Sequence, residues 1–148
     1  MSFSAAFRVD AGSRIGLGHV SRSLALAKEL LRAGARVVWI ARRLPAEWRA
    51  TLISLGIELY TLPDLYGPSL VSSSALAPGG APWERDAHHT LQILGSTRPP
   101  FDLLVVDHYE LDAKWESRMR SLATMILAID DAHDDRPGRA HDCDFLLD

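Results

Sequence analysis

The chain alternates between two patterns of apolar and polar positions. Apolar residues at helical spacing occur in a segment that starts near Val20 and in three further segments, at 44–56, 83–96 and 112–123. Short runs with the composition of strands lie around them, at 5–9, 35–41, 57–62, 101–107, 124–130 and 143–148. This alternation predicts an α/β domain, with a Rossmann-like parallel sheet and helices on both of its faces.

Glycine and proline mark the expected ends of these elements. Gly34 follows the first helix at the position of a left-handed cap, and the helix at 44–56 has proline in its first turn and glycine at its end. The stretch 63–82 is rich in Pro, Gly and Ser, which predicts a long surface loop of the kind that often carries function. We expect residues 1–148 to form a single domain whose last apolar run lies at a domain boundary.

Composition excludes several classes of protein. The net charge of -3 gives no basic footprint for nucleic acid, and the single cysteine, Cys143, cannot form an intrachain disulfide. The amino terminus lacks the features of a signal peptide. No apolar run approaches the roughly 18 residues of a membrane span. The sequence therefore predicts a cytoplasmic protein with no nucleic-acid partner and no membrane partner.

Candidate site residues follow the predicted strands. Ligands of open α/β sheets bind beyond the carboxyl ends of the strands, and this rule selects the segments 10–19, 63–82, 107–110 and 130–135. Three of these segments are rich in His and Asp. Such a concentration of ionisable groups at strand ends fits a binding site better than a packing role.

A glycine-rich turn leads into the first helix, in the stretch "RIGLGHVSRSLALAKELL". Gly16 and Gly18 allow a tight turn and the close approach of a ligand, but Ser21 replaces the third glycine of a dinucleotide fingerprint. A plain strand-to-helix turn fits equally well. His19 opens the helix, where the macrodipole favours a neutral imidazole that can act as a general base. The alternative is a histidine that only hydrogen-bonds nearby backbone.

Two further polar segments lie after strands. In "VVDHYE", Asp107, His108 and Tyr109 could each contact sugar hydroxyls, and the alternative is a helix-capping aspartate beside surface residues. The segment "IDDAHDDRPGRAHDCD" contains many possible metal ligands. Its spacing matches no zinc pattern and it has one cysteine, so we interpret it as a solvated acidic loop and predict no metal.

Four stretches carry a resemblance to a known family. They are "FRVDAGSRIGLGHVSRSLALA" (7–27), "WERDAHHTLQIL" (83–94), "DLLVVDHYELDAKWE" (102–116) and "IDDAHDDRPGRAHDCDFLLD" (129–148). Together they resemble the amino-terminal domain of the UDP-sugar hydrolases of pseudaminic acid biosynthesis, also labelled spore-coat-polysaccharide-type proteins. The match covers most of the chain in the same order and includes the unusual strings "VDHY" and "HDCD".

The resemblance implies both a fold and an activity. The fold would be the amino-terminal half of a GT-B-type enzyme, whose carboxyl-terminal half, absent from these 148 residues, holds most of the nucleotide site. The activity would be hydrolysis of a UDP-linked diacetamido-trideoxy sugar to UDP and free sugar, without a cofactor. The base of the family falls on His19. The implied substrate-binding positions are Asp10, Gly16, Gly18, Arg22, Asp107, His108, Tyr109, Asp130 and Asp131.

Two alternatives remain beside this expectation. A GT-B-type glycosyltransferase would use the same sheet and glycine loop, with an acceptor hydroxyl in place of water. A non-catalytic sugar-binding or scaffolding domain is the third possibility. The loop after Asp131 looks longer than the family pattern, so no roles are assigned at 132–140.

Overall fold

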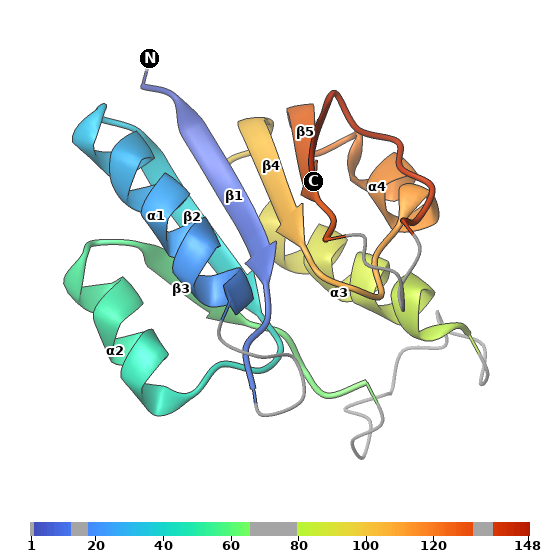
Figure 1. The fold of residues 1–148 in the computed structure, drawn as a ribbon, viewed down its shortest axis with the longest axis horizontal. Coiled ribbons are helices and arrows are strands. Elements are labelled where there is room, and N and C mark those ends of the chain that lie inside the picture. The colour runs from blue at the N-terminus through green and yellow to red at the C-terminus, as the bar shows by residue number, and fades with distance from the viewer. Residues whose placement is uncertain (1, 13–17, 66–79, 132–137) are drawn as a thin grey trace.

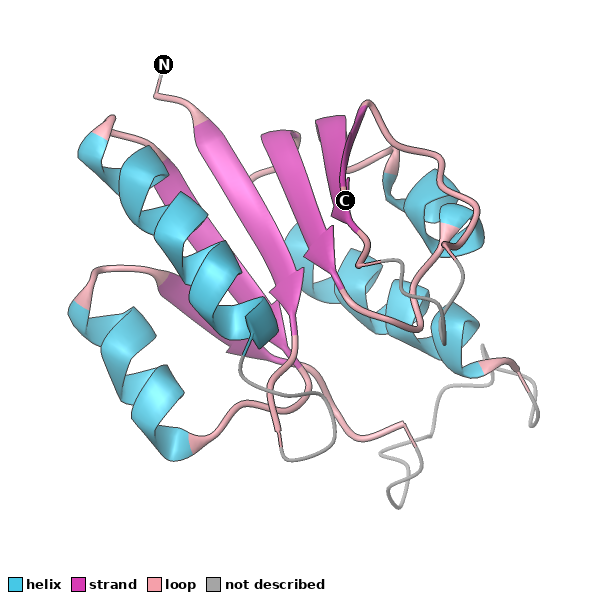
Figure 2. Cartoon of the chain, viewed as in Figure 1, coloured by secondary structure: helices cyan, strands magenta, loops and turns pink. Residues whose placement is uncertain are grey.

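The structure, a computed structural model, describes residues 2–12, 18–65, 80–131 and 138–148. Strands and helices alternate as the sequence predicts (Figures 1 and 2). The elements are β1 (Ser4–Val9), α1 (Gly18–Arg32), β2 (Arg36–Ala41), α2 (Ala46–Ser54), β3 (Glu58–Thr61), α3 (Pro82–Gly95), β4 (Phe101–Asp107), α4 (Ala113–Met119), β5 (Ala123–Ile129) and β6 (Phe145–Leu147). The main difference is in α4, which ends at Met119 because the chain turns there to start β5 at Ala123.

The six strands form one parallel sheet in the order β3-β2-β1-β4-β5-β6. This is the Rossmann order, in which the chain first builds outward from β1 and then returns to place β4 on its other side. The register pairs Val9 with Asp107, so β1 and β4 end at the same level. The predicted Rossmann-like α/β fold is therefore confirmed, and its switch point lies between β1 and β4.

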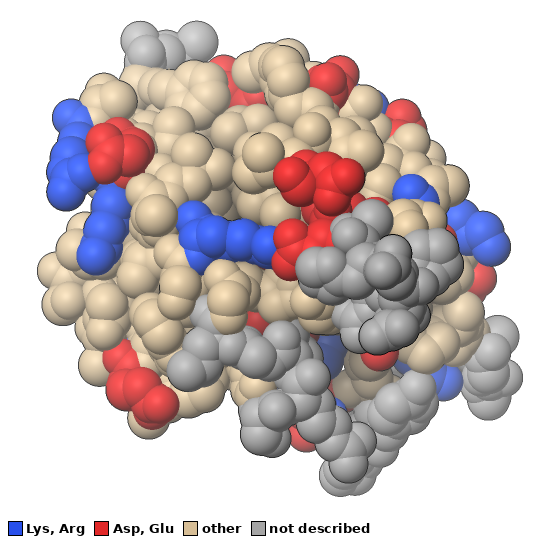
Figure 3. All heavy atoms as spheres, in the orientation of Figure 1, with Lys and Arg blue, Asp and Glu red and all other residues tan. Residues whose placement is uncertain are grey.

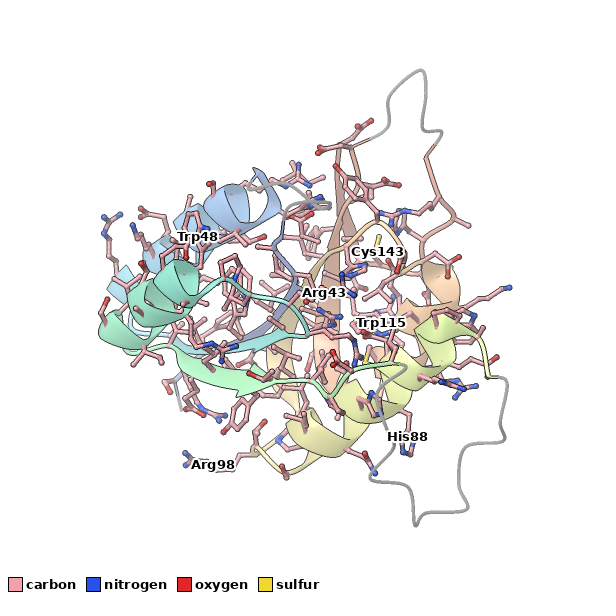
Figure 4. The ribbon with its side chains drawn as sticks, turned by 90° about the horizontal axis from the view of Figure 1, so that it is seen from below. Arg43, Trp48, His88, Arg98, Trp115 and Cys143 are labelled. Carbon is pink, nitrogen blue, oxygen red and sulfur yellow. The ribbon has the colours of Figure 1, made fainter. Side chains whose placement is uncertain are left out.

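Helices cover both faces of the sheet. Figure 4, which views the molecule from below, shows α1 and α2 on one face of the sheet and α3 and α4 on the other, with Trp48 and Trp115 on opposite sides. Alternate strand residues enter two separate cores: Val105 packs with the residues of α1 and α2, whereas Val106 packs with those of α3 and α4. Successive side chains of a strand point to opposite faces of the sheet. The same alternation determines which polar residues can contact one another at the strand ends.

Glycine ends the first two helices as expected. Gly34 has φ +87° and Gly56 has φ +81°, both in the left-handed region where a side chain would be strained. The amide of Ala35 donates to the carbonyl of Leu30 at 2.9 Å and so closes the end of α1. Of the predicted loop at 63–82, residues 66–79 lie outside the described residues, and α3 begins at Pro82.

The surface and the helices carry two general findings. In the described residues no helix combines the length and the apolar composition that crossing a membrane requires. On the face shown in Figure 3, basic and acidic side chains are interspersed and do not form a patch of one sign.

Candidate active site at the carboxyl edge of the sheet

Neighbouring residues at the strand ends point to opposite faces of the sheet. Asp107 points to the α1 face and contacts His19, whereas His108 points to the α3 face and contacts Asp10. The two acidic residues at 130–131 separate in the same way. The polar segments that the sequence places together therefore form distinct groups of contacts.

A histidine–aspartate pair lies on the α1 face. His19, the second residue of α1, places Nδ1 against Oδ1 of Asp107, the last residue of β4. Both side chains are buried, with exposed fractions of 3% and 0%. The ring of Tyr109 packs edge-on against His19, with 4.3 Å between ring centroids and 82° between planes. Nε2 of His19 is buried and has no hydrogen-bond partner in the described part of the chain.

The contacts of Asp107 establish which nitrogen of His19 carries the proton. Burial by itself would raise the pKa of Asp107, but hydrogen bonds from Arg22 and His19 outweigh it and lower that pKa. An ionised carboxylate only accepts hydrogen bonds, so Nδ1 of His19 must donate. In a neutral ring, the second nitrogen, Nε2, then holds a free lone pair. Nη2 of Arg22 lies 3.1 Å from Nδ1 of His19, because these two nitrogens donate to the same oxygen, Oδ1 of Asp107.

Arg22 connects α1 to the ends of β4 and β5. Its Nε and Nη2 donate to the two oxygens of Asp107 at 2.7 and 2.6 Å, and its Nη1 donates to Asp131 at 2.5 Å. The hydroxyl of Ser23 also donates to Asp107, at 3.1 Å. The hydrogen bond to Asp107 is the main cause of a raised pKa for Arg22, despite partial burial. Asp107 is thus held by three side chains of α1.

A buried ionic group that the sequence analysis missed lies on the α3 face. Arg8, the last residue but one of β1, donates to both oxygens of Asp10 at 2.8 and 3.1 Å and to both oxygens of Asp86 at 3.1 and 2.6 Å. Arg42 and the indole of Trp115 also donate to Asp86, each at 3.0 Å. Two features of the sequence could have indicated this group. Arg8 lies inside an otherwise apolar strand, and Asp86 lies on the apolar face of a helix.

The polar atoms of Asp10 and His108 are engaged within the protein. Oδ1 of Asp10 accepts from the amide of Arg42 at 2.7 Å, and Oδ2 accepts from Nε2 of His108 at 3.0 Å. Nδ1 of His108 accepts from the amide of Glu110 at 3.1 Å. Arg8 outweighs the effect of burial and lowers the pKa of Asp10. These contacts join the ends of β1, β2 and β4, and substrate contact by either side chain stays a prediction.

A third group surrounds His141. Its Nδ1 lies 2.7 Å from Glu116 of α4, and its Nε2 lies 2.8 Å from Asp130 at the end of β5. Both neighbours offer carboxyl oxygens, which accept hydrogen bonds from ring N–H groups and so favour the charged form of the ring. Burial opposes this charge, but the bonds to Asp130 and Glu116 outweigh it and raise the pKa of His141. Asp130 also accepts from the amide of Arg139 at 3.0 Å.

This arrangement predicts a loss of stability at alkaline pH. The folded protein holds the His141 proton more tightly than the unfolded chain, whose histidine pKa is about 6.5. The stabilisation is complete below that value and is lost as pH rises through the raised pKa of the folded state. Urea unfolding between about pH 6 and 9 measures it. The variant His141→Gln is expected to lose this component, and an unchanged pH dependence in that variant would contradict the assignment.

The remaining predicted positions divide by what the structure describes. Gly18 begins α1, and among the described residues a Cβ added there would meet no atom within 4 Å beyond its chain neighbours and its own helix backbone. Gly16 and the possible ligands at 133–135 lie outside the described residues. In the described ranges no three His, Cys, Asp or Glu side chains come together in a group that could hold a metal ion.

Comparison with known proteins adds no assignment to this geometry. No protein-family model matches the chain, and no curated protein matches its sequence. The residues at the carboxyl edge of the sheet therefore provide the basis for a proposed function.

Proposed function

We propose that the chain is the catalytic amino-terminal half of a GT-B-type enzyme that hydrolyses a UDP-linked diacetamido-trideoxy sugar, with His19 as the general base. One observation carries this proposal: Nδ1 of His19 is bound to Asp107, and Nε2 is buried without a described partner. A base, an orienting carboxylate and a free lone pair are the parts that activation of a nucleophile needs. His108 and His141, by contrast, have a described partner at both ring nitrogens.

The chemistry is a single displacement. Nε2 of His19 takes a proton from water while the water oxygen forms a bond to the anomeric carbon. The bond from that carbon to the UDP oxygen breaks, and its electron pair leaves on the diphosphate. Attack opposite the leaving group inverts the anomeric centre. Asp107 accepts the Nδ1 proton and so orients the ring, and the imidazolium that forms then returns its Nε2 proton to solvent.

Burial of His19 has a consequence for the substrate. An exposed fraction of 3% means that water and sugar reach Nε2 only after neighbouring side chains move. The half-buried Tyr109 packs against the ring, and we assign it to the sugar subsite. Exclusion of bulk water from such a site strengthens the electrostatic interactions inside it.

The proposal extends to the context of the enzyme. A second α/β half would bring most of the UDP contacts to the carboxyl edge of this sheet, where ligands of such folds bind. The enzyme would act in the cytoplasm, in the synthesis of pseudaminic acid and surface polysaccharide. No cofactor takes part, because UDP is already a good leaving group and water is the nucleophile.

The test is an incubation of the complete protein with the UDP-sugar and no acceptor. We expect UDP and free sugar in equal amounts, and the first anomer detected by proton NMR should be the inverted one. Release of UDP only after an acceptor alcohol is added would instead identify a glycosyltransferase. Absence of turnover, with no binding of UDP or sugar, would favour a scaffolding domain and overturn the proposal.

A further inference from the structure

We propose that Arg22 is a positioning residue that keeps His19 uncharged by serving as the counter-ion of Asp107. This inference rests on the proposed function, because an uncharged imidazole is what a general base requires. It gives Arg22 a role in the protonation of the base, in place of the substrate contact that the family resemblance implies.

The starting point is the buried carboxylate. Asp107 is fully buried, and an ionised carboxylate removed from water needs a positive partner. Two side chains can supply the charge: His19 as an imidazolium, or Arg22 as a guanidinium. If His19 were the only partner, the carboxylate would favour the charged ring, which has no lone pair to accept a proton.

Arg22 is the better counter-ion on both geometry and chemistry. Its guanidinium is charged at all relevant pH values and binds both oxygens of Asp107, at 2.7 and 2.6 Å. Its Nη2 also lies 3.1 Å from Nδ1 of His19. A second positive charge on the ring would therefore be placed directly beside the first, which disfavours the imidazolium.

The other groups around His19 do not reverse this balance. The amino-terminal end of α1 carries the positive end of the helix dipole and also disfavours a charged ring. Tyr109 contributes an aromatic edge. Asp131 accepts a hydrogen bond from Nη1 of the same guanidinium, but its side chain is 31% exposed, so water screens its negative charge. Asp107 is the fully buried carboxylate that contacts the ring.

The donors of Arg22 also indicate a positioning role. Nε, Nη1 and Nη2 each donate to a carboxylate within the chain, on Asp107 or Asp131, and these bonds use three of the five N–H groups of the guanidinium. The bonds fix the plane of the guanidinium against Asp107. We therefore assign the effect of Arg22 on the reaction to Asp107 and His19.

The direct test is nitrogen NMR of the 148-residue chain with labelled histidine, at about pH 7. In the wild type we expect His19 to be a neutral ring with its proton on Nδ1. In Arg22→Gln we expect the imidazolium, since loss of a contacting charge shifts such an equilibrium about tenfold or more. Asp131→Asn is the matched control, because it leaves both bonds to Asp107 intact, and its His19 should stay neutral.

Arg22→Lys separates charge from fold. Lysine keeps the positive charge with a single point of contact, so we expect His19 to be more neutral than in Arg22→Gln. If Arg22→Gln fails to give a dispersed amide spectrum, Arg22→Lys is compared with the wild type, and its single contact should leave His19 more charged than in the wild type. An equally neutral ring in the two proteins would then count against the inference. A charged His19 in the wild type, or a ring that stays neutral in folded Arg22→Gln, would overturn the inference.

A kinetic arm tests the consequence for catalysis in the complete protein. In Arg22→Gln, the acid limb of the kcat/KM profile should move to higher pH, with a loss of about tenfold or more near pH 7 that shrinks under alkaline conditions. A substrate-contact role would instead raise KM at every pH without moving the limb, and that result would contradict the inference. If the complete protein does not hydrolyse UDP-sugars, the proposed function fails while the NMR result still decides the role of Arg22.

Discussion

His19→Asn in the complete protein should lower kcat for UDP-sugar hydrolysis by about 10²–10⁴-fold. The change removes the lone pair at Nε2, which the structure leaves without a described partner. Asp107→Asn should cost about 10⁴-fold, since the new amide can hold the proton of His19 on Nε2 and so block the base. The two losses should not add in the double variant, because the residues act as one unit.

His88→Asn provides a matched control for these rates. His88 lies on α3, on the other face of the sheet, and contacts the ring of His89 rather than the site (Figure 4). Its kcat should stay within about twofold of wild type. Stopped assays of released UDP measure all the variants. Near wild-type turnover in His19→Asn would remove the assignment of the base, whatever the result for Asp107→Asn.

Asp86→Ala should lower the free energy of unfolding of the chain by about 3–5 kcal/mol. Burial alone would raise the pKa of Asp86, but Arg8 and Arg42 outweigh it and lower the pKa to about 2. The side chain of Arg8 is 1% exposed, so removing Asp86 leaves a buried guanidinium with Asp10 as its one carboxylate partner among the described residues. Trp115 would lose its acceptor as well.

The surface pair of Glu29 and Arg32 is the control for this prediction. Both side chains are about two-thirds exposed or more, at 66% and 70%, and water screens their attraction. Glu29→Ala should therefore change the free energy of unfolding by less than about 0.5 kcal/mol. Urea titration monitored by circular dichroism gives both values. A loss below about 1 kcal/mol in Asp86→Ala would mean that the neighbouring arginines find other partners.

Much of the fold could be predicted from local patterns. The alternation of strand-like and helix-like segments, and the glycine at position 34, depend on interactions within a few residues of the chain. Such local interactions can be inferred from the order of the residues alone. The rule that ligands bind at the carboxyl ends of strands also selects the segments that contain His19, Asp107 and Asp131.

The contacts within the site could not be predicted in the same way. Asp107 and His108 are neighbours in sequence, yet one joins His19 and the other joins Asp10 on the opposite face of the sheet. Which residue turns to which face depends on the phase of the strand within the sheet. A shift of one residue would exchange the two roles. The partner of Arg8 likewise lies 78 residues away in α3.

The sequence alone predicts a Rossmann-like α/β domain with histidine and aspartate at its strand ends, because local periodicity specifies the order of the elements. Only the tertiary structure decided that Asp107 faces His19 across 88 residues and that Arg22 holds the same carboxylate. It also decided that Asp86 anchors α3 to Arg8. These pairings depend on strand register and helix packing, which no short stretch of the chain encodes by itself.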